Sequence, residues 1–196
     1  MKHLIILAAF FFAANITHGQ VNPVNEFNQK KIKIIKQSML VLAGWGAANC
    51  IYSGFSAGNS NGSQKYFHNM NVIWGGVNLG LGAIGYLFTK SQYELSYSQS
   101  LQKQSVVEKV FLFNAGVDVA YIMGGVYLHE KKGGSIINHD RNNGYGRSIM
   151  LQGSALFLFD GIMYLIHENH GKKLYKFADK IQVGITLSGI GCIVKL

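Results

Sequence analysis

Two aspartates interrupt long apolar runs of this chain. Asp118 lies near the centre of residues 110–128, VFLFNAGVDVAYIMGGVYL, and is the only charged residue there. Asp160 has the same setting in residues 148–166. An ionisable group in apolar surroundings is energetically costly, so it must be satisfied by partners, be protonated or serve a function. These two carboxyls are therefore the first candidates for a functional site.

Amide and aromatic side chains recur in the other apolar runs. The pattern WGxxN occurs twice, at residues 45–49 and 74–78, and a Trp and an Asn four residues apart share one helix face. At about 1.5 Å per residue, the two Asn and the two Asp fall within several ångströms of one plane. The predicted polar layer comprises Asn49, Asn78, Asp118, Asp160, Trp45, Trp74, Tyr121 and Tyr164.

Two interpretations of this layer remain open. No Lys or Arg lies inside the apolar runs, so the aspartates have no counter-ion there and would share a proton or be neutral. A polar clasp that fixes the register of packed helices is the first interpretation. A relay for protons or cations, or a site for a small ligand, is the second. The sequence contains no metal-ligand set, cofactor fingerprint or catalytic motif, so no metal, cofactor or enzymatic activity is predicted.

Four apolar segments must position these residues: 38–57, 72–88, 110–128 and 148–166. Each has close to the roughly 20 residues that span a hydrocarbon core. Polar connectors at residues 58–64, 91–108 and 131–147 separate them, which favours two antiparallel hairpins. A GxxxG spacing at Gly76 and Gly80 predicts close helix packing. With only 14% charged residues and 24 Gly, the fold class expected is all-α, a four-helix transmembrane bundle.

The two ends of the chain have different compositions. Residues 1–19, MKHLIILAAFFFAANITHG, have the basic start, short apolar core and small final residues of a cleavable signal peptide. Residues 20–37 form a basic leader, either a helix in the head-group region or a solvated segment. Residues 38–171 form the bundle. Residues 172–196 form a basic tail, whose alternation from Ile181 predicts a short β-hairpin turning at residues 189–191, with a short amphipathic segment as the alternative.

The lysines conflict with the signal peptide. A cleaved signal and four spans place both ends outside the cell, yet the positive-inside rule prefers basic residues in the cytoplasm. Either the N-terminal run is not cleaved, or the lysines lie too far from the spans to count, or the bundle is periplasmic and never inserts. Twelve lysines fall on the side of the chain ends (30, 31, 33, 36, 90, 103, 109, 172, 173, 176, 180 and 195), against five basic residues on the other side (65, 131, 132, 141 and 147).

The chain resembles a family of uncharacterised small bacterial envelope proteins. The resemblance rests on the Trp-x3-Asn repeat and on FHNMNVIWGGVN at residues 67–78, and it spans residues 38–171. It implies a helical, membrane-associated fold and brings no known activity or site. The function expected is a non-enzymatic scaffold or partner subunit in the bacterial cell membrane, which contacts lipid, a second copy or another membrane protein. The alternatives are a small proton or cation channel that uses both aspartates and a soluble periplasmic binding protein. No nucleic-acid partner is expected.

Overall fold

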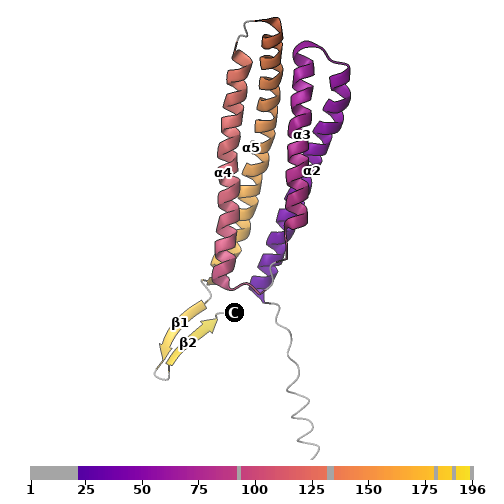
Figure 1. Cartoon of the computed structure of the whole chain (residues 1–196). Coiled ribbons are helices and arrows are strands. Elements are labelled where there is room, and N and C mark those ends of the chain that lie inside the picture. Colours follow the sequence, from indigo (N-terminus) through magenta and orange to yellow (C-terminus); the bar gives the residue numbers. More distant parts are fainter. Residues whose placement is uncertain (1–21, 92–93, 132–134, 179–180, 187–188, 195–196) are drawn as a thin grey trace, which may run out of the picture.

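Four long helices make up most of the described chain (Figure 1). The computed structural model describes residues 22–91, 94–131 and 135–178, with strands at 181–186 and 189–194. The helices are α2 (Pro23–Gly58), α3 (Gly62–Phe88), α4 (Tyr97–Glu130) and α5 (Ile136–Ala178). Each predicted apolar segment lies inside one of them, so the four-helix architecture is confirmed. The predicted signal peptide, residues 1–19, lies outside the described residues.

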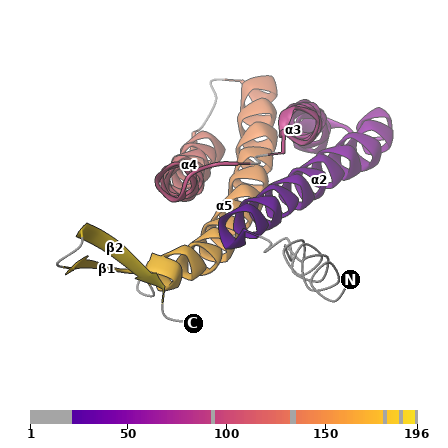
Figure 2. The same cartoon turned by 90° about the horizontal axis from the view of Figure 1, so that it is seen from below.

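The helices form two antiparallel hairpins, α2–α3 and α4–α5. Helix α5 contacts all three other helices, whereas the backbones of α3 and α4 are not closely packed against each other. The view from below places α5 between α4 and the α2–α3 hairpin (Figure 2). The hairpins are therefore joined mainly through α3 and α5, and one side between α3 and α4 stays open.

Helices extend into segments predicted as polar leader or connectors. Asn22 caps α2 by accepting from Val24 N, with Pro23 at the first helical position. The leader is thus continuous with the first span. Ser96 and Gln99 form a capping box that starts α4. Helix α5 starts at Ile136, so the predicted loops over residues 97–108 and 136–147 are wrong. Gly144 and Gly146, which suggested a turn, instead allow α5 to approach α3 and α4 closely.

Glycines set the spacing within both hairpins. A Cβ on Gly75 would lie 2.7 Å from the Gly46 carbonyl oxygen and 2.8 Å from Cys50 Sγ. A Cβ on Gly146 would lie 2.6 Å from the Gly125 carbonyl oxygen. Backbones this close leave no room for side chains between the paired helices. The predicted GxxxG pair does not do this, because a Cβ on Gly76 or Gly80 meets nothing within 4 Å.

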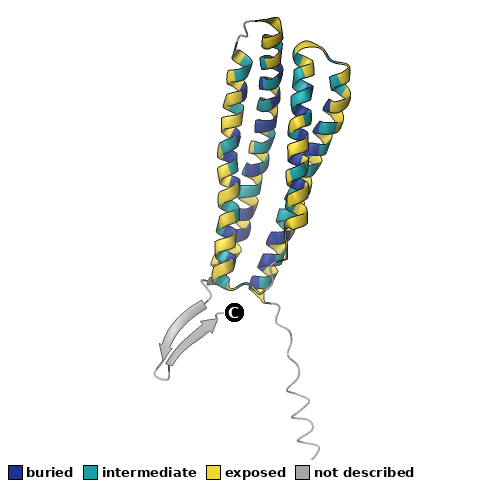
Figure 3. Cartoon of the chain, in the orientation of Figure 1, coloured by how far each residue is buried: buried dark blue, intermediate teal, exposed yellow. Residues whose placement is uncertain are grey.

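The exposed outer faces of the helices (Figure 3) carry an apolar band. The exposed large apolar side chains fall in residues 40–55, 73–88, 106–127 and 151–166, with Ile136, Ile137 and Tyr175 as exceptions. These stretches are about 24–33 Å long at the helical rise, close to the thickness of a hydrocarbon core. All four helices are long and apolar enough to cross a membrane.

Three helices continue beyond the band at one end. We call this end the foot: residues 23–37 of α2, 97–105 of α4 and 167–178 of α5. The start of α2 and the end of α5 both lie there (Figure 1). The chain continues into β1 (Ile181–Thr186) and β2 (Gly189–Val194), which pair antiparallel with Ile181 opposite Val194. Gly189 and Gly191 lie in β2 and not in a turn.

Substituting the contact glycines is expected to destabilise the fold. Gly46→Ala and Gly75→Ala each place a methyl group against the backbone of the partner helix, which costs about 1–3 kcal/mol of overpacking. Gly44→Ala and Gly76→Ala are matched controls because their sites are open. Thermal unfolding in detergent, followed by helical circular dichroism, should show lower midpoints for the first pair alone. Equal midpoints for all four variants would contradict this packing.

Candidate functional site

The interior of the bundle is organised around the side-chain amide of Gln152 on α5. Its Nε2 donates to Asn49 Oδ1 on α2 and to Asn71 Oδ1 on α3, both at 2.8 Å. Its Oε1 accepts from Trp45 Nε1 at 2.9 Å and, more weakly, from Asn78 Nδ2 at 3.5 Å. Gln152 itself is fully buried. One amide therefore connects three helices from both hairpins.

Two further bonds complete this Gln152 network. Ser148, one turn before Gln152, donates to Asn71 Oδ1 at 2.8 Å. Asn49 Nδ2 donates back to the Trp45 carbonyl oxygen at 2.8 Å, which explains the spacing of the first WGxxN pattern. Buried polar groups that satisfy one another in this way hold helices in one register.

The two aspartates meet in a second cluster. Asp118 on α4 and Asp160 on α5 lie close enough to interact directly, and Asn114 lies beside Asp160. Two carboxyls in such contact, away from water, favour one shared proton over two full charges. Both side chains are buried, at 3% and 6% exposure. Asp118 Oδ2 has no hydrogen-bond partner among the described residues.

This Asp pair opens into a groove of about 320 Å³. All four helices contribute to its lining, and Asn78 belongs to both the groove and the Gln152 network. Trp74 and Tyr121 face each other on its wall, with ring centroids 5.1 Å apart in an edge-to-face arrangement. The groove lies where the backbones of α3 and α4 are apart and only side chains such as Trp74 and Tyr121 meet. It combines an apolar wall with buried carboxyls.

The predicted polar layer is thus placed as two adjoining clusters. Asn49, Asn78 and Trp45 contact Gln152, whereas Asp118, Asp160, Trp74 and Tyr121 line the groove. Gln152 and Asp160 are separated by about 12 Å along α5, so the clusters do not form one flat layer. Tyr164 is half-buried and joins neither cluster by a hydrogen bond or ring contact.

Three members of the interior were not predicted: Gln152, Asn71 and Ser148. Gln152 interrupts the apolar run of residues 148–166 just as Asp160 does. Gln152 carries no charge and therefore stands out less than Asp160 in the sequence. An unpaired amide in an apolar interior is also energetically costly, so a polar residue within an apolar run is the signal that identifies Gln152.

The foot contains a separate set of buried polar residues. Lys31 on α2 is fully buried and donates to Asn28 Oδ1 at 3.2 Å. Asn28 Nδ2 in turn donates to Ser100 Oγ on α4 at 2.7 Å. Across the foot, Gln104 Nε2 on α4 donates to the His167 carbonyl oxygen on α5 at 2.7 Å. These bonds hold the ends of three helices together.

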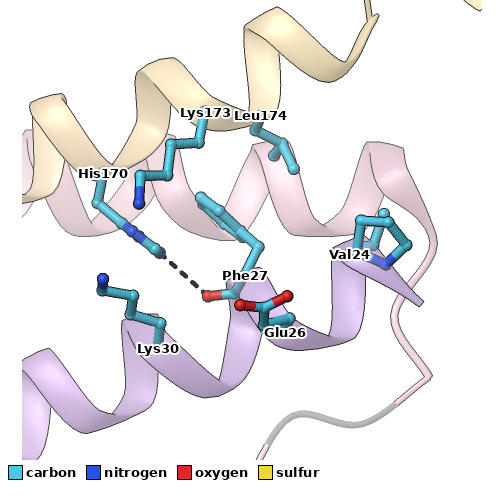
Figure 4. Close-up of a pocket in the computed structure, with 8 residues that line it drawn as sticks. Val24, Glu26, Phe27, Lys30, His170, Lys173 and Leu174 are labelled. Carbon is cyan, nitrogen blue, oxygen red and sulfur yellow. Dashed lines mark hydrogen bonds between the residues drawn. The ribbon is translucent and has the colours of Figure 1, made fainter. Parts of the chain in front are cut away.

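A small pocket of about 180 Å³ lies between α2 and α5 in the foot (Figure 4). His170 stacks on Phe27 with ring centroids 4.2 Å apart. His170 Nε2 lies 3.0 Å from the Phe27 carbonyl oxygen, which only accepts, so Nε2 carries the proton. Burial lowers the pKa of His170, which opposes a positive charge on the ring. Lys30, Lys173 and Glu26 also line the pocket.

Burial has its clearest electrostatic effect at Lys31. Desolvation, followed by the nearby positive charge of Lys103, lowers the pKa of Lys31 from 10.5 to about 8. His167 and His170 on α5 also lie within electrostatic reach of this ammonium group. The foot therefore holds a cation in a place that disfavours its charged form.

Fold and interior together define a class: a helical protein of two hairpins, long and apolar enough to cross a membrane, with a polar interior. Residues 41–161 match the model of a family of unknown function, DUF6992, and the chain belongs to this family. This agrees with the expected membership of an uncharacterised family. No curated protein and no solved structure matches the chain. The matched residues include the Gln152 network and the Asp pair, whereas Lys31, His167 and His170 lie outside them.

Removing the central amide is expected to loosen both hairpins. Gln152→Leu keeps a side chain of similar size but leaves Trp45, Asn49 and Asn71 short of a partner. Since each buried polar group without a partner costs about 1–3 kcal/mol, the free energy of unfolding should fall by about 2 kcal/mol or more. Thermal or denaturant unfolding in detergent measures this. Gln102→Leu, on the exposed face of α4, is the control, and an equal loss there would refute the central role of Gln152.

Stability should rise between about pH 8 and 10.5 because of Lys31. In this interval the unfolded chain still binds a proton at Lys31 whereas the folded chain has released it, so raising the pH favours the folded state. Below about pH 8 both states are protonated, and this contribution is constant. Lys31→Met should remove the rise, and Lys30→Met, exposed one residue away, should retain it. Unfolding midpoints at pH 7.5, 9 and 10 provide the measurement.

Proposed function

We propose that this protein is a non-enzymatic integral membrane protein that acts as a scaffold or partner subunit of a bacterial envelope complex. The Gln152 network is the main support for this proposal, since the polar groups at the centre of the bundle form hydrogen bonds between helices. An interior used in this way fixes the arrangement of the hairpins. A fixed arrangement presents a constant outer surface to lipid, to a second copy or to another membrane protein.

The apolar band supports placement in a bilayer. Phe55, Phe88 and Phe113 are each more than 70% exposed on three different helices. A soluble periplasmic protein, the second alternative to the scaffold, would leave all of these side chains in water. This is unfavourable for so large a continuous apolar surface. At the foot edge of the band, Lys36 Nζ lies 5.3 Å from the Tyr86 ring centroid, an arrangement typical of the membrane interface.

Close packing supports a scaffold over a channel. The glycine contacts between α2 and α3, and between α4 and α5, leave no space for a water path inside either hairpin. The two carboxyls of the Asp pair, on α4 and α5, lie against each other, and Asn114 lies beside Asp160. Such a pair fits the expected clasp.

One observation favours the alternative, a proton or cation relay. Asp118 Oδ2 is buried and has no partner among the described residues, beside a groove large enough for several waters. A carboxyl with a free oxygen in an apolar band is the usual element of such a relay. Flux measurements separate the two functions.

Purified protein in lipid vesicles should carry no proton or cation current. With a pH-sensitive dye inside the vesicles and an imposed pH or potassium gradient, wild type and Asp118→Asn/Asp160→Asn should both match empty vesicles. The double variant should keep the wild-type expression level and oligomeric state, because Asn retains hydrogen bonding in the clasp.

The control for this assay is insertion itself, verified by resistance of the vesicle-bound protein to carbonate extraction. If the wild type shows pH-dependent flux and a folded double variant does not, the scaffold proposal is wrong and the relay is the function. Release of the protein by carbonate would remove the membrane assignment.

A further inference from the structure

The groove beside the Asp pair has the composition of a ligand site and not of a helix interface. We infer that it binds a small organic cation, an ammonium group attached to an apolar or aromatic body. The inference does not depend on the scaffold role, because it concerns the side of the bundle that the Gln152 network leaves open.

Charge is the first argument. An Asp pair that shares one proton keeps one negative charge, and the apolar runs around it contain no Lys or Arg. Asp118 lines the groove, and its buried Oδ2 lacks a hydrogen-bond partner among the described residues. An ammonium group would supply the missing donor as a charge-assisted hydrogen bond.

The wall of the groove is the second argument. Trp74, Tyr121, Phe111 and Phe159 line it together with aliphatic side chains. Aromatic faces attract cations and also bury the apolar part of a ligand. Asn78 and Asn114 add amide groups near the carboxyls. A bare Ca²⁺ or Mg²⁺ ion requires about six oxygen ligands, whereas this wall consists mainly of apolar and aromatic side chains.

Size and access complete the argument. A volume of about 320 Å³ lies at the lower end of the range for small-molecule sites, about 300–1,000 Å³. The groove lies within the apolar band, between α3 and α4, whose backbones are not closely packed against each other. An amphipathic cation dissolved in the bilayer would therefore reach the carboxyls from the side, without crossing the closed interior.

Binding can be measured with 2-phenylethylammonium, and 2-phenylethanol serves as the neutral probe of the same skeleton. Trp74 lines the groove and Trp45 does not, and these are the two Trp of the chain. In nanodiscs, the ammonium probe should give a saturable change in Trp fluorescence, which persists in Trp45→Phe. The alcohol should give only the unsaturable drift of partition into lipid, as in empty nanodiscs.

Variants assign the site. Asp118→Asn and Asp160→Asn should each weaken binding at least tenfold, whereas Asp140→Asn, an aspartate of α5 outside the groove, should leave it unchanged. Val77→Trp keeps both carboxyls but fills the groove from α3, so it should also abolish binding; because it adds a Trp, binding to this variant and to the wild type is compared by titration calorimetry. Helicity and elution volume confirm that each variant is folded, and Val77→Trp keeps the test decisive if an Asp variant does not fold.

Three outcomes would overturn the inference. The first is an equal saturable response to the alcohol. The second is ammonium binding that survives both Asp118→Asn and Val77→Trp. The third is a Trp74 response to sodium alone that is lost in Asp118→Asn, which would assign the groove to an inorganic cation. Vesicle flux and probe binding are read independently, so failure of the scaffold proposal is distinguishable from failure of the cation site.

Discussion

The fold depends on one constraint, the need to satisfy a primary amide at the centre of an apolar bundle. Gln152 has two N–H donors and one carbonyl acceptor, and all three functions are used by α2 and α3. In an apolar interior no water would replace these partners. Sliding or rotating one hairpin against the other would therefore break several buried bonds together. The register of the hairpins follows from this, and so does the position of the open side between α3 and α4.

Glycine makes this constraint possible to meet. The side chains of Asn49 and Asn71 are short, so they reach Gln152 only if the backbones of α2, α3 and α5 lie close together. Gly46 and Gly75 bring α2 to α3, and Gly144 lets α5 pass against the start of α3. The same closeness removes space inside the hairpins. The remaining space in the bundle is the groove between α3 and α4, which the Asp pair lines.

In the foot, the cost of burying charged and polar groups is lower than within the apolar band. Beyond the apolar band the helices lie near water, where a buried charge is less costly because the ammonium or imidazole can lose its proton or reach solvent. Lys31, His167 and His170 are buried there. Lys31 and His170 have hydrogen-bond partners, whereas the His167 ring stacks on Phe111 and its two nitrogens have no partner among the described residues. The many exposed lysines of the foot suit a surface of anionic head groups. The protein thus has two polar regions, a neutral amide interior within the band and a basic assembly beyond it.

The sequence by itself determined the number of helices, their pairing into hairpins and the inward positions of Asn49, Asn78, Asp118 and Asp160, because hydrophobic run length and helical spacing are local properties. It also identified the Trp-Asn repeat, and three of the four side chains of this repeat, Trp45, Asn49 and Asn78, contact Gln152. It placed the starts of α4 and α5 too late in the chain, since polar, Gly-rich stretches resemble loops until a partner helix covers them. Only the tertiary structure decided that Gln152 is the centre, that Gly46 and Gly75 replace Gly76 and Gly80 at the contact, and that the aspartates separate from the amides. Those outcomes depend on which helix faces meet, and residues far apart in the chain settle that only when they come into contact.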